Sequence, residues 1–482
     1  MIKMGISDKK KIICIAAALL LIAVLIVSGV LLVRANREKE PSLSEIVSDK
    51  LNAYQTDLAD SLETLNTNEK VADYLMSWAS NKNIKASRDE ANNVIFSLKA
   101  SSKELSGGKP TIIACEYDAS DMLSYIEPMA TALTVAKNSK NHGDFKLLFM
   151  PSESGRMYGA SAVSASYLTD GTELFYLGKS SSSKVSLTTG GYEELEISAK
   201  LDRSSPTHDK AYKISIDGVP AQTIGGKYKS APNPIKQLGS LLASFKSSSF
   251  LFELSSFSGG SGVNVTPAEA KMTIVINSAD DEKFISKMDK AIEKFYDKYS
   301  EDFPDISYTY EETKLPKKVF VKTETENIIS LLYTSPNGVY YKDDDGNIAA
   351  LTNIGKISTK NAKLDIRLCA MSSSYELLDE LHDSYRTIAG LCSANIHTRE
   401  HYDIFSGGGA CAALLNSFET AFLSYTEDSK MIVEPAFETN ACNVLYERNP
   451  NIAMIYCAIT EKTKEKFAGS LISYLDGGEA LA

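Results

Sequence analysis

Apolar and polar positions along the chain predict alternating helices and strands behind one long apolar segment. Residues 12–33 form a run of 22 residues without a charge, which is enough for a helix to cross about 30 Å of hydrocarbon. From about 46 to 82 apolar residues recur at helical spacing, whereas short apolar runs at 94–100 and 111–117 are typical of strands. The alternation of strands and helices up to about residue 190 indicates an α/β layer with a partly parallel sheet.

The pattern changes after Gly190 and Gly191. Strand-like segments such as 192–201 and 271–277 now alternate around long helical segments such as 281–299, which is typical of an inserted α+β domain. The predicted organisation is a cytoplasmic tail over 1–11, a transmembrane anchor over 12–33, a linker over 34–45, an α/β domain formed by 46–191 and 406–482, and an inserted domain over 192–405.

The apolar span at 12–33 predicts an uncleaved signal-anchor. A cleaved signal peptide usually has an apolar core of only about 7–15 residues. Four lysines precede the span (Lys3 and Lys9–Lys11), and three basic residues follow it (Arg34, Arg37 and Lys39). The positive-inside rule therefore favours a cytoplasmic N-terminus. We expect a single-pass membrane protein whose large domain is extracytoplasmic.

Charge and cysteine usage narrow the functional classes. The chain has 482 residues, 51 Lys and Arg against 62 Asp and Glu, and a formal net charge of −11. This acidic balance argues against a nucleic-acid partner, because phosphate contacts need Lys and Arg. The seven cysteines contain no C-x-x-C pair, and most lie in apolar runs. We therefore expect buried free thiols and no disulfide framework.

Several segments, taken in order, resemble the di-zinc aminoacyl-histidine dipeptidases (Xaa-His dipeptidases), a family of metallopeptidases. The resemblance covers nearly everything after about residue 65. It implies a metallopeptidase-like α/β domain with a mixed sheet, interrupted by a lid-like domain of the kind that often mediates homodimerisation. It also implies peptide hydrolysis at two zinc ions held by His and carboxylates. The segments are GKPTIIACEYD (108–118), MATALTVAKNSKNHGDFKLLF (129–149), ESGRMYGA (153–160), FSGGSGVNVTP (257–267) and ACNVLYERNPNIAMIY (441–456).

The positions of the family's first ligands are only partly kept. Its strand-end His-x-Asp corresponds to Glu116-Tyr117-Asp118, so the His is replaced and the Asp is retained. The bridging Asp falls at or near Ser124. The Glu-Glu pair, general base followed by ligand, corresponds to Glu153-Ser154, which keeps only the base.

The remaining ligand positions are also changed. The next Asp ligand should fall near Gly178, where there is no carboxylate. The Gly-Gly-His-Ser-Gly motif of the inserted domain corresponds to residues 221–225, which contain no His. The last His ligand should follow residues 452–458, but no His occurs after His401.

The resemblance therefore implies a homologue that has lost the zinc site and acts in peptide or protein binding, a pseudoenzyme for which we expect no cofactor. Zinc prefers imidazole and thiolate, and a catalytic zinc needs about three protein ligands. The alternative is an active metallo-dipeptidase with a rebuilt site. Glu116, Asp118 and Glu153 would then hold zinc or a hard cation such as Ca²⁺ or Mg²⁺, with Glu153 as the general base.

Two further motifs have simpler interpretations. His397 to His401 matches the H-x-x-E-H string of zinc proteases, which requires a helix; the flanking residues predict a strand, on which the two His would lie about 13 Å apart. Asp343 to Asn347 is similar to the start of a calcium loop, but the flanking strand patterns and the Asp-Gly pair favour a hairpin turn.

Overall fold

The computed structural model describes residues 42–153, 155–223, 231–427 and 430–477. The predicted anchor at 12–33 lies outside these ranges, as do Ser154 and residues 224–225 of the family motifs. Within the described ranges, no helix combines the length and the apolar character that a membrane span requires. The six cysteines found there are all free and buried, as expected.

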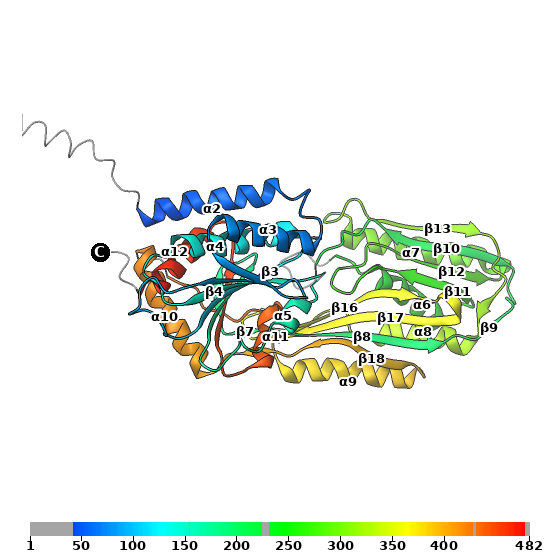
Figure 1. Cartoon of the computed structure of the whole chain (residues 1–482). Helices are drawn as coiled ribbons and strands as arrows, with labels where there is room; N and C mark the ends of the chain where they lie inside the picture. Colours follow the sequence, from blue (N-terminus) through cyan, green and yellow to red (C-terminus); the bar gives the residue numbers. More distant parts are fainter. Residues whose placement is uncertain (1–41, 154, 224–230, 428–429, 478–482) are drawn as a thin grey trace, which may run out of the picture.

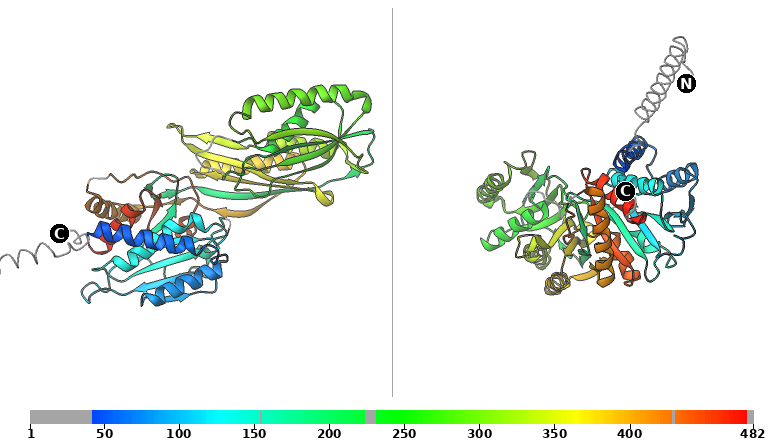
Figure 2. Two further views of the ribbon diagram at one scale, coloured as in Figure 1. Left: turned by 90° about the horizontal axis from the view of Figure 1, so that it is seen from above. Right: turned by 90° about the vertical axis from the view of Figure 1, so that its left-hand side faces the viewer.

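Two β-sheets lie end to end in an elongated molecule, as Figure 1 and Figure 2 show. The first has seven strands in the order β1-β2-β4-β3-β5-β20-β6. Its central strands β4, β3, β5 and β20 run parallel, and the outer pairs are antiparallel. The strands are β1 (Lys85–Arg88), β2 (Val94–Leu98), β3 (Thr111–Tyr117), β4 (Phe145–Pro151), β5 (Glu173–Lys179), β6 (Lys184–Ser186) and β20 (Ala453–Ile459).

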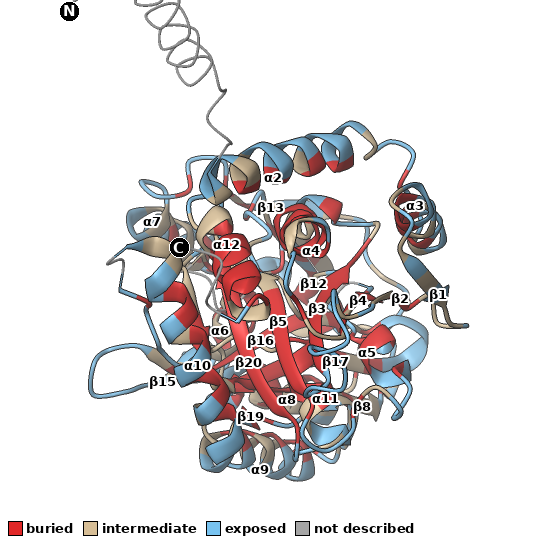
Figure 3. Ribbon diagram, turned by 60° about the vertical axis from the view of Figure 1, so that its left-hand side comes forward, coloured by how far each residue is buried: buried red, intermediate tan, exposed pale blue. Residues whose placement is uncertain are grey.

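Helices cover both faces of this first sheet, so its central strands are buried along most of their length (Figure 3). Such burial explains why β3 is a continuous apolar run and not an alternating one. One face packs against α2 (Leu43–Asp60), α3 (Asn68–Asn81), α4 (Ile126–Asn138), α10 (Gly409–Thr426) and α12 (Lys464–Leu475). The other packs against α5 (Tyr158–Ala162) and α11 (Ala441–Arg448).

The second sheet belongs to the inserted segment and is antiparallel throughout. Its order is β13-β10-β12-β11-β16-β17-β8-β18, with β15 paired to β16. The strands are β8 (Gly191–Lys200), β10 (Lys210–Asp217), β11 (Glu253–Gly259), β12 (Ala270–Ile276), β13 (Ser307–Thr313), β15 (Gly338–Lys342), β16 (Ile348–Ser358), β17 (Lys363–Ser372) and β18 (Asn395–Tyr402).

Four helices bury their apolar faces against one side of this sheet and form a separate core. They are α6 (Pro234–Ser247), α7 (Asp281–Tyr299), α8 (Lys322–Thr334) and α9 (Tyr375–Leu391). Minor elements complete the two domains: β7 (Thr188–Thr189), β9 (Arg203–Ser204), β14 (Val319–Phe320), β19 (Phe405–Ser406) and the 3₁₀ turns η1 (Met122–Ser124), η2 (Ser278–Asp280) and η3 (Lys360–Ala362).

Local predictions agree with this architecture, with shifts at element ends. The helical pattern at 46–82 is two helices, and α2 begins at Leu43 inside the predicted linker, because Ser42 and Glu45 form a capping box there. The Gly- and Ala-rich segment near 156–168, expected to be one helix, forms only the five-residue α5.

The two simpler motif interpretations are confirmed. His397 and His401 lie on strand β18, whose residues alternate in exposure, so they cannot share a metal as neighbours on a helix would. Asp343 and Asn347 close the β15–β16 hairpin, where the Asp343 N–H donates to the Asn347 carbonyl at 2.9 Å.

Candidate functional site

The three candidate carboxylates lie where the parallel strands of the first sheet end. Glu116 is near the end of β3, Asp118 follows that strand directly, and Glu153 follows β4. In open α/β sheets, ligands bind outside the carboxyl ends of the strands, at the point where the strand order reverses. The strand order reverses at β3, because β4 and β5 flank it on opposite sides.

Glu116 is a buried carboxyl group held by a tyrosine. Only 5% of the surface of Glu116 is exposed, and the Tyr176 hydroxyl donates a hydrogen bond to Glu116 Oε2 at 2.6 Å. Burial raises the pKa of Glu116 to about 7, although the Tyr176 hydrogen bond acts in the opposite direction. Near neutral pH, this group is therefore divided between its protonated and charged forms.

Asp118 shapes the end of the strand. It is buried, and its Oδ1 accepts hydrogen bonds from the Ser120 backbone N–H at 2.8 Å and the Ser120 hydroxyl at 2.6 Å. The neighbouring Ala119 N–H donates to Asn68 Oδ1 at 2.8 Å. An aspartate that accepts from the backbone two residues ahead stabilises a tight turn, so part of its hydrogen-bonding capacity serves the fold.

Glu153 does not join the two buried carboxyl groups. It is exposed to solvent and forms a tight turn in which its N–H donates to the Arg156 carbonyl at 3.1 Å, and the Arg156 N–H returns a bond at 3.0 Å. Arg156 Nε lies 3.6 Å from Glu400 Oε2, and the Met157 N–H donates to the Tyr402 hydroxyl at 3.4 Å. The turn thus contacts β18 of the inserted domain.

A lysine stands beside the position of another family ligand. Gly178, where the next Asp ligand should fall, is followed by Lys179 at the end of β5. Lys179 Nζ lies 3.1 Å from Glu127 Oε1 and donates to the Leu123 carbonyl at 3.0 Å. Ser124, at the position of the bridging Asp, ends the 3₁₀ turn η1. An ammonium group at this edge opposes a bound cation electrostatically.

The residues present do not fit a di-zinc centre. Among the described residues, no group of three or more His, Cys, Asp or Glu side chains is placed to hold a metal ion. The structure brings Glu116 and Asp118 to one strand end and leaves Glu153 in solvent. A catalytic zinc needs about three protein ligands and an open position for water, and a glycine stands where the family has the next acid.

Three residues of this region could not be identified from the sequence. Tyr176 is separated from Glu116 by 60 positions, and Tyr402 reaches the region from the inserted domain. Lys179 belongs to a Lys- and Ser-rich stretch that is typical of a loop.

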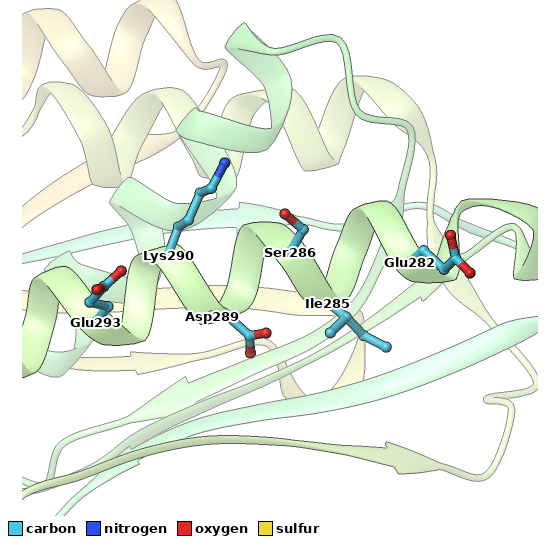
Figure 4. A pocket seen from close by; sticks show the side chains of 6 residues that line it. All are labelled: Glu282, Ile285, Ser286, Asp289, Lys290 and Glu293. Carbon is cyan, nitrogen blue, oxygen red and sulfur yellow. The ribbon is translucent and has the colours of Figure 1, made fainter.

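A hollow on the outer face of α7 lies apart from this region (Figure 4). Residues of that helix alone line it, so no groups from different elements converge there. The lining residues are Glu282, Ile285, Ser286, Asp289, Lys290 and Glu293.

Comparison with known proteins finds similarity in both sequence and fold. Residues 210–302 match the peptidase dimerisation domain of the M20 group. The chain is 21% identical over 361 residues to the cytosol non-specific dipeptidase of Escherichia coli (strain K12), covering 67% of this chain and 74% of that protein. Its fold is similar to the crystal structure of aminoacylhistidine dipeptidase from Vibrio alginolyticus, with a TM-score of 0.66, 18% identity, and coverage of 87% of this chain and 96% of that one.

Fold and comparisons together define an α/β metallopeptidase-like protein that carries an M20 dimerisation domain. The resemblance seen in the sequence is confirmed: the chain is similar to M20 dipeptidases in sequence and in fold.

Proposed function

We propose that this protein is a non-hydrolytic relative of the zinc dipeptidases, which binds a peptide or a protein segment near the carboxyl ends of β3, β4 and β5. The observation that carries the proposal is the state of Glu116. At the position of the family's first zinc-binding His, the chain has a buried carboxyl group that accepts a hydrogen bond from Tyr176. A protein hydroxyl group thereby satisfies an atom at the position that the family uses for metal binding.

A positive charge at the same edge of the sheet supports the same conclusion. Lys179 occupies the neighbouring strand end and pairs with Glu127. A doubly charged ion bound at Glu116 would displace the proton that this group holds below a pKa of about 7, and the ammonium group of Lys179 at the same sheet edge would repel the ion. The two interactions therefore act together against zinc binding.

Membrane anchoring is part of the proposal and depends on the apolar span at 12–33. With the N-terminus in the cytoplasm, both folded domains would lie on the extracytoplasmic side of the membrane. The full chain should then sediment with membranes and be released by detergent, but not by high salt or alkaline carbonate. Release by salt or carbonate would contradict the anchor.

Metal analysis together with a hydrolysis assay tests the loss of catalysis. The purified chain is dialysed against zinc and calcium, then freed of unbound metal and analysed by elemental mass spectrometry. Hydrolysis of alanyl-histidine is followed in parallel, with and without a chelator. We expect well below one metal ion per chain and no hydrolysis. Two zinc ions per chain with chelator-sensitive hydrolysis would overturn the proposal.

The active alternative makes a different prediction for the same assay. If Glu116, Asp118 and Glu153 formed a rebuilt site, about one divalent ion should bind, and Glu153→Gln should abolish turnover. Under our proposal Glu153→Gln changes neither quantity, because the side chain is exposed and, among the described residues, no three acidic side chains are grouped to hold a metal ion.

Peptide binding requires its own measurement. Calorimetric titration with alanyl-histidine should give a heat of binding without product formation. Arg156 lies in the turn at the domain junction, and we expect Arg156→Gln to weaken peptide binding. Absence of binding to a panel of dipeptides and longer peptides would contradict the binding function.

A further inference from the structure

The parallel strands of the first domain have two edges, and the candidate site with Glu116 lies at the carboxyl edge. At the opposite edge β3 and β4 begin side by side, because Thr111 pairs with Phe145, and β2 ends there. Residues 99–110 lead from β2 into β3, and residues 137–144 lead from the end of α4 into β4. We call these two segments the amino-edge surface. At a rise of about 3.3 Å per residue, it lies about 17 Å from Glu116 along β3.

Backbone hydrogen bonds join the two segments into one surface. The Ser101 N–H donates to the His142 carbonyl at 3.0 Å. The Lys140 N–H donates to Asp476 Oδ1 at 3.1 Å, which holds the second segment against the end of α12. The amino-edge surface is therefore a fixed part of the first domain.

The amino-edge surface is basic although the chain is acidic. It contains five lysines against two acidic residues, Glu104 and Asp144, whereas the whole chain has a net charge of −11. All five lysines are exposed. Leu105, on the same surface, is an apolar residue that is 41% exposed. The lysines are Lys99, Lys103, Lys109, Lys137 and Lys140.

Helix α2 begins at this end of the first domain. The Ser48 hydroxyl donates to Glu465 Oε1 at 2.9 Å, and Gln55 Nε2 donates to Glu461 Oε2 at 3.1 Å. Helix α2 thus runs antiparallel to α12, and its first turn lies toward the edge at which α12 ends. Figure 1 and Figure 2 show the start of α2 at the end of the molecule opposite the inserted domain.

The anchor proposed at 12–33 limits how far the start of α2 can lie from the bilayer. Eight residues, 34–41, connect this span with Ser42, and eight residues reach at most about 29 Å. Helix α2 has 18 residues and is therefore about 27 Å long. To bring the carboxyl edge onto the bilayer, the connection would have to run back along the whole of α2. The amino-edge surface requires no such path.

We propose that the amino-edge surface lies against anionic phospholipid headgroups of the membrane that anchors the chain. The inference rests on the anchor of the proposed function and adds which face of the first domain contacts the bilayer. An anionic leaflet attracts lysines close to it. It repels the acidic carboxyl edge, which carries Glu116, Asp118 and Glu153. The candidate site and the inserted domain consequently face away from the bilayer, where peptides approach from solution.

Fluorescence quenching by lipids tests this orientation in the full chain. Gly108→Cys is introduced in a Cys14→Ser background and labelled with an environment-sensitive dye. An added Cβ at Gly108 meets no atom within 4 Å, and the six cysteines of the described residues are buried, so the new thiol reacts preferentially. The vesicles contain phosphatidylcholine, phosphatidylglycerol and a lipid with a nitroxide quencher on its headgroup. The matched control is Gly390→Cys in α9, which is also exposed and has the same free space.

We expect the dye at position 108 to be quenched and the dye at position 390 to stay bright. Absence of quenching at position 108, or equal quenching at both positions, in chains that float with the vesicles would overturn the orientation and leave the anchor intact. A chain that does not float with the vesicles would contradict the anchor and this inference together. Neither result depends on whether the chain hydrolyses or binds peptides.

Removal of charge tests the role of the lysines. Each lysine near an anionic surface strengthens binding roughly fivefold, so the loss of three should weaken docking roughly 100-fold. The variant should still float with the vesicles, but quenching at position 108 should disappear, as it should for wild type on pure phosphatidylcholine. Unchanged quenching in either case would overturn the proposal. The variant combines Lys103→Gln, Lys137→Gln and Lys140→Gln, and the control, which should behave like wild type, combines Lys283→Gln, Lys290→Gln and Lys294→Gln on α7.

Discussion

Replacing Glu116 by glutamine should remove a pH dependence from the stability of the first domain. The wild-type carboxyl group is buried and keeps its proton up to a pKa of about 7 in the folded chain, against an ordinary value of 4.5. Between these values, the folded state holds a proton that the unfolded state has released. Stability therefore falls as the pH rises through this window.

The magnitude follows from the two pKa values. One pKa unit corresponds to about 1.4 kcal/mol, so the shift from 4.5 to about 7 amounts to about 3 kcal/mol. The contribution is fully present below pH 4.5 and is lost once the pH exceeds about 7. Glutamine keeps an acceptor for the Tyr176 hydroxyl and cannot ionise. Relative to Glu116→Gln, the wild-type chain should therefore lose about 3 kcal/mol between pH 4.5 and pH 8.

The assay can be confined to the domain that contains Glu116. Trp78 is the single tryptophan of the chain and is stacked on Phe96 in the core of the first domain, with ring centroids 5.8 Å apart. Urea unfolding followed by tryptophan fluorescence at several pH values thus reports on this domain. Glu153→Gln serves as the matched control, because it removes an exposed carboxylate from the same strand edge. Parallel stability curves for wild type and Glu116→Gln would refute the reasoning.

Three other changes have defined consequences. Tyr176→Phe removes a hydrogen bond that lowers the pKa of Glu116, so the tryptophan-detected pH transition should move upward; a downward shift would contradict this. Lys236→Met leaves the end of α8 uncapped and should destabilise the inserted domain by about 1–3 kcal/mol, measured by urea unfolding with tyrosine circular dichroism. Asn353→Ala leaves two buried carbonyls without a donor and should cost at least about 2 kcal/mol in the same assay. Surface substitutions usually change stability by no more than about 0.5 kcal/mol. A cost below about 0.5 kcal/mol for Lys236→Met or Asn353→Ala would therefore contradict the role of these hydrogen bonds.

Features that depend on local pattern could be predicted from the sequence. The buried run of β3, the strand position of His397 and His401, and the hairpin at Asp343 each follow from a few neighbouring residues. The loss of ligand types was also visible, because it required only the residue at each family position. The length of α5 was predicted less well, since the Gly- and Ala-rich segment has no capping residue to define where the helix ends.

Features that join distant segments could not be predicted. The sequence shows Glu116 at a ligand position but not that Tyr176 would bond to it, because the contact depends on the parallel pairing of β3 and β5. The same limit applies to Asn233 and Asn353, which are 120 positions apart in the sequence and form a hydrogen bond only in the folded inserted domain.

The candidate site and the buried amide network of the inserted domain have a common physical logic. In each, a buried polar group is paired by a distant segment of the same chain. Tyr176 donates a hydrogen bond to Glu116 at the end of β3, Asn353 donates to the carbonyls of Val263 and Val265, and Lys236 donates to the carbonyl of Leu332 near the end of α8. Because buried polar groups are costly when unpaired, a substitution that removes one partner and leaves the other buried, such as Asn353→Ala, should destabilise the chain. A di-zinc centre would require new ligands at all five family positions that this chain has changed.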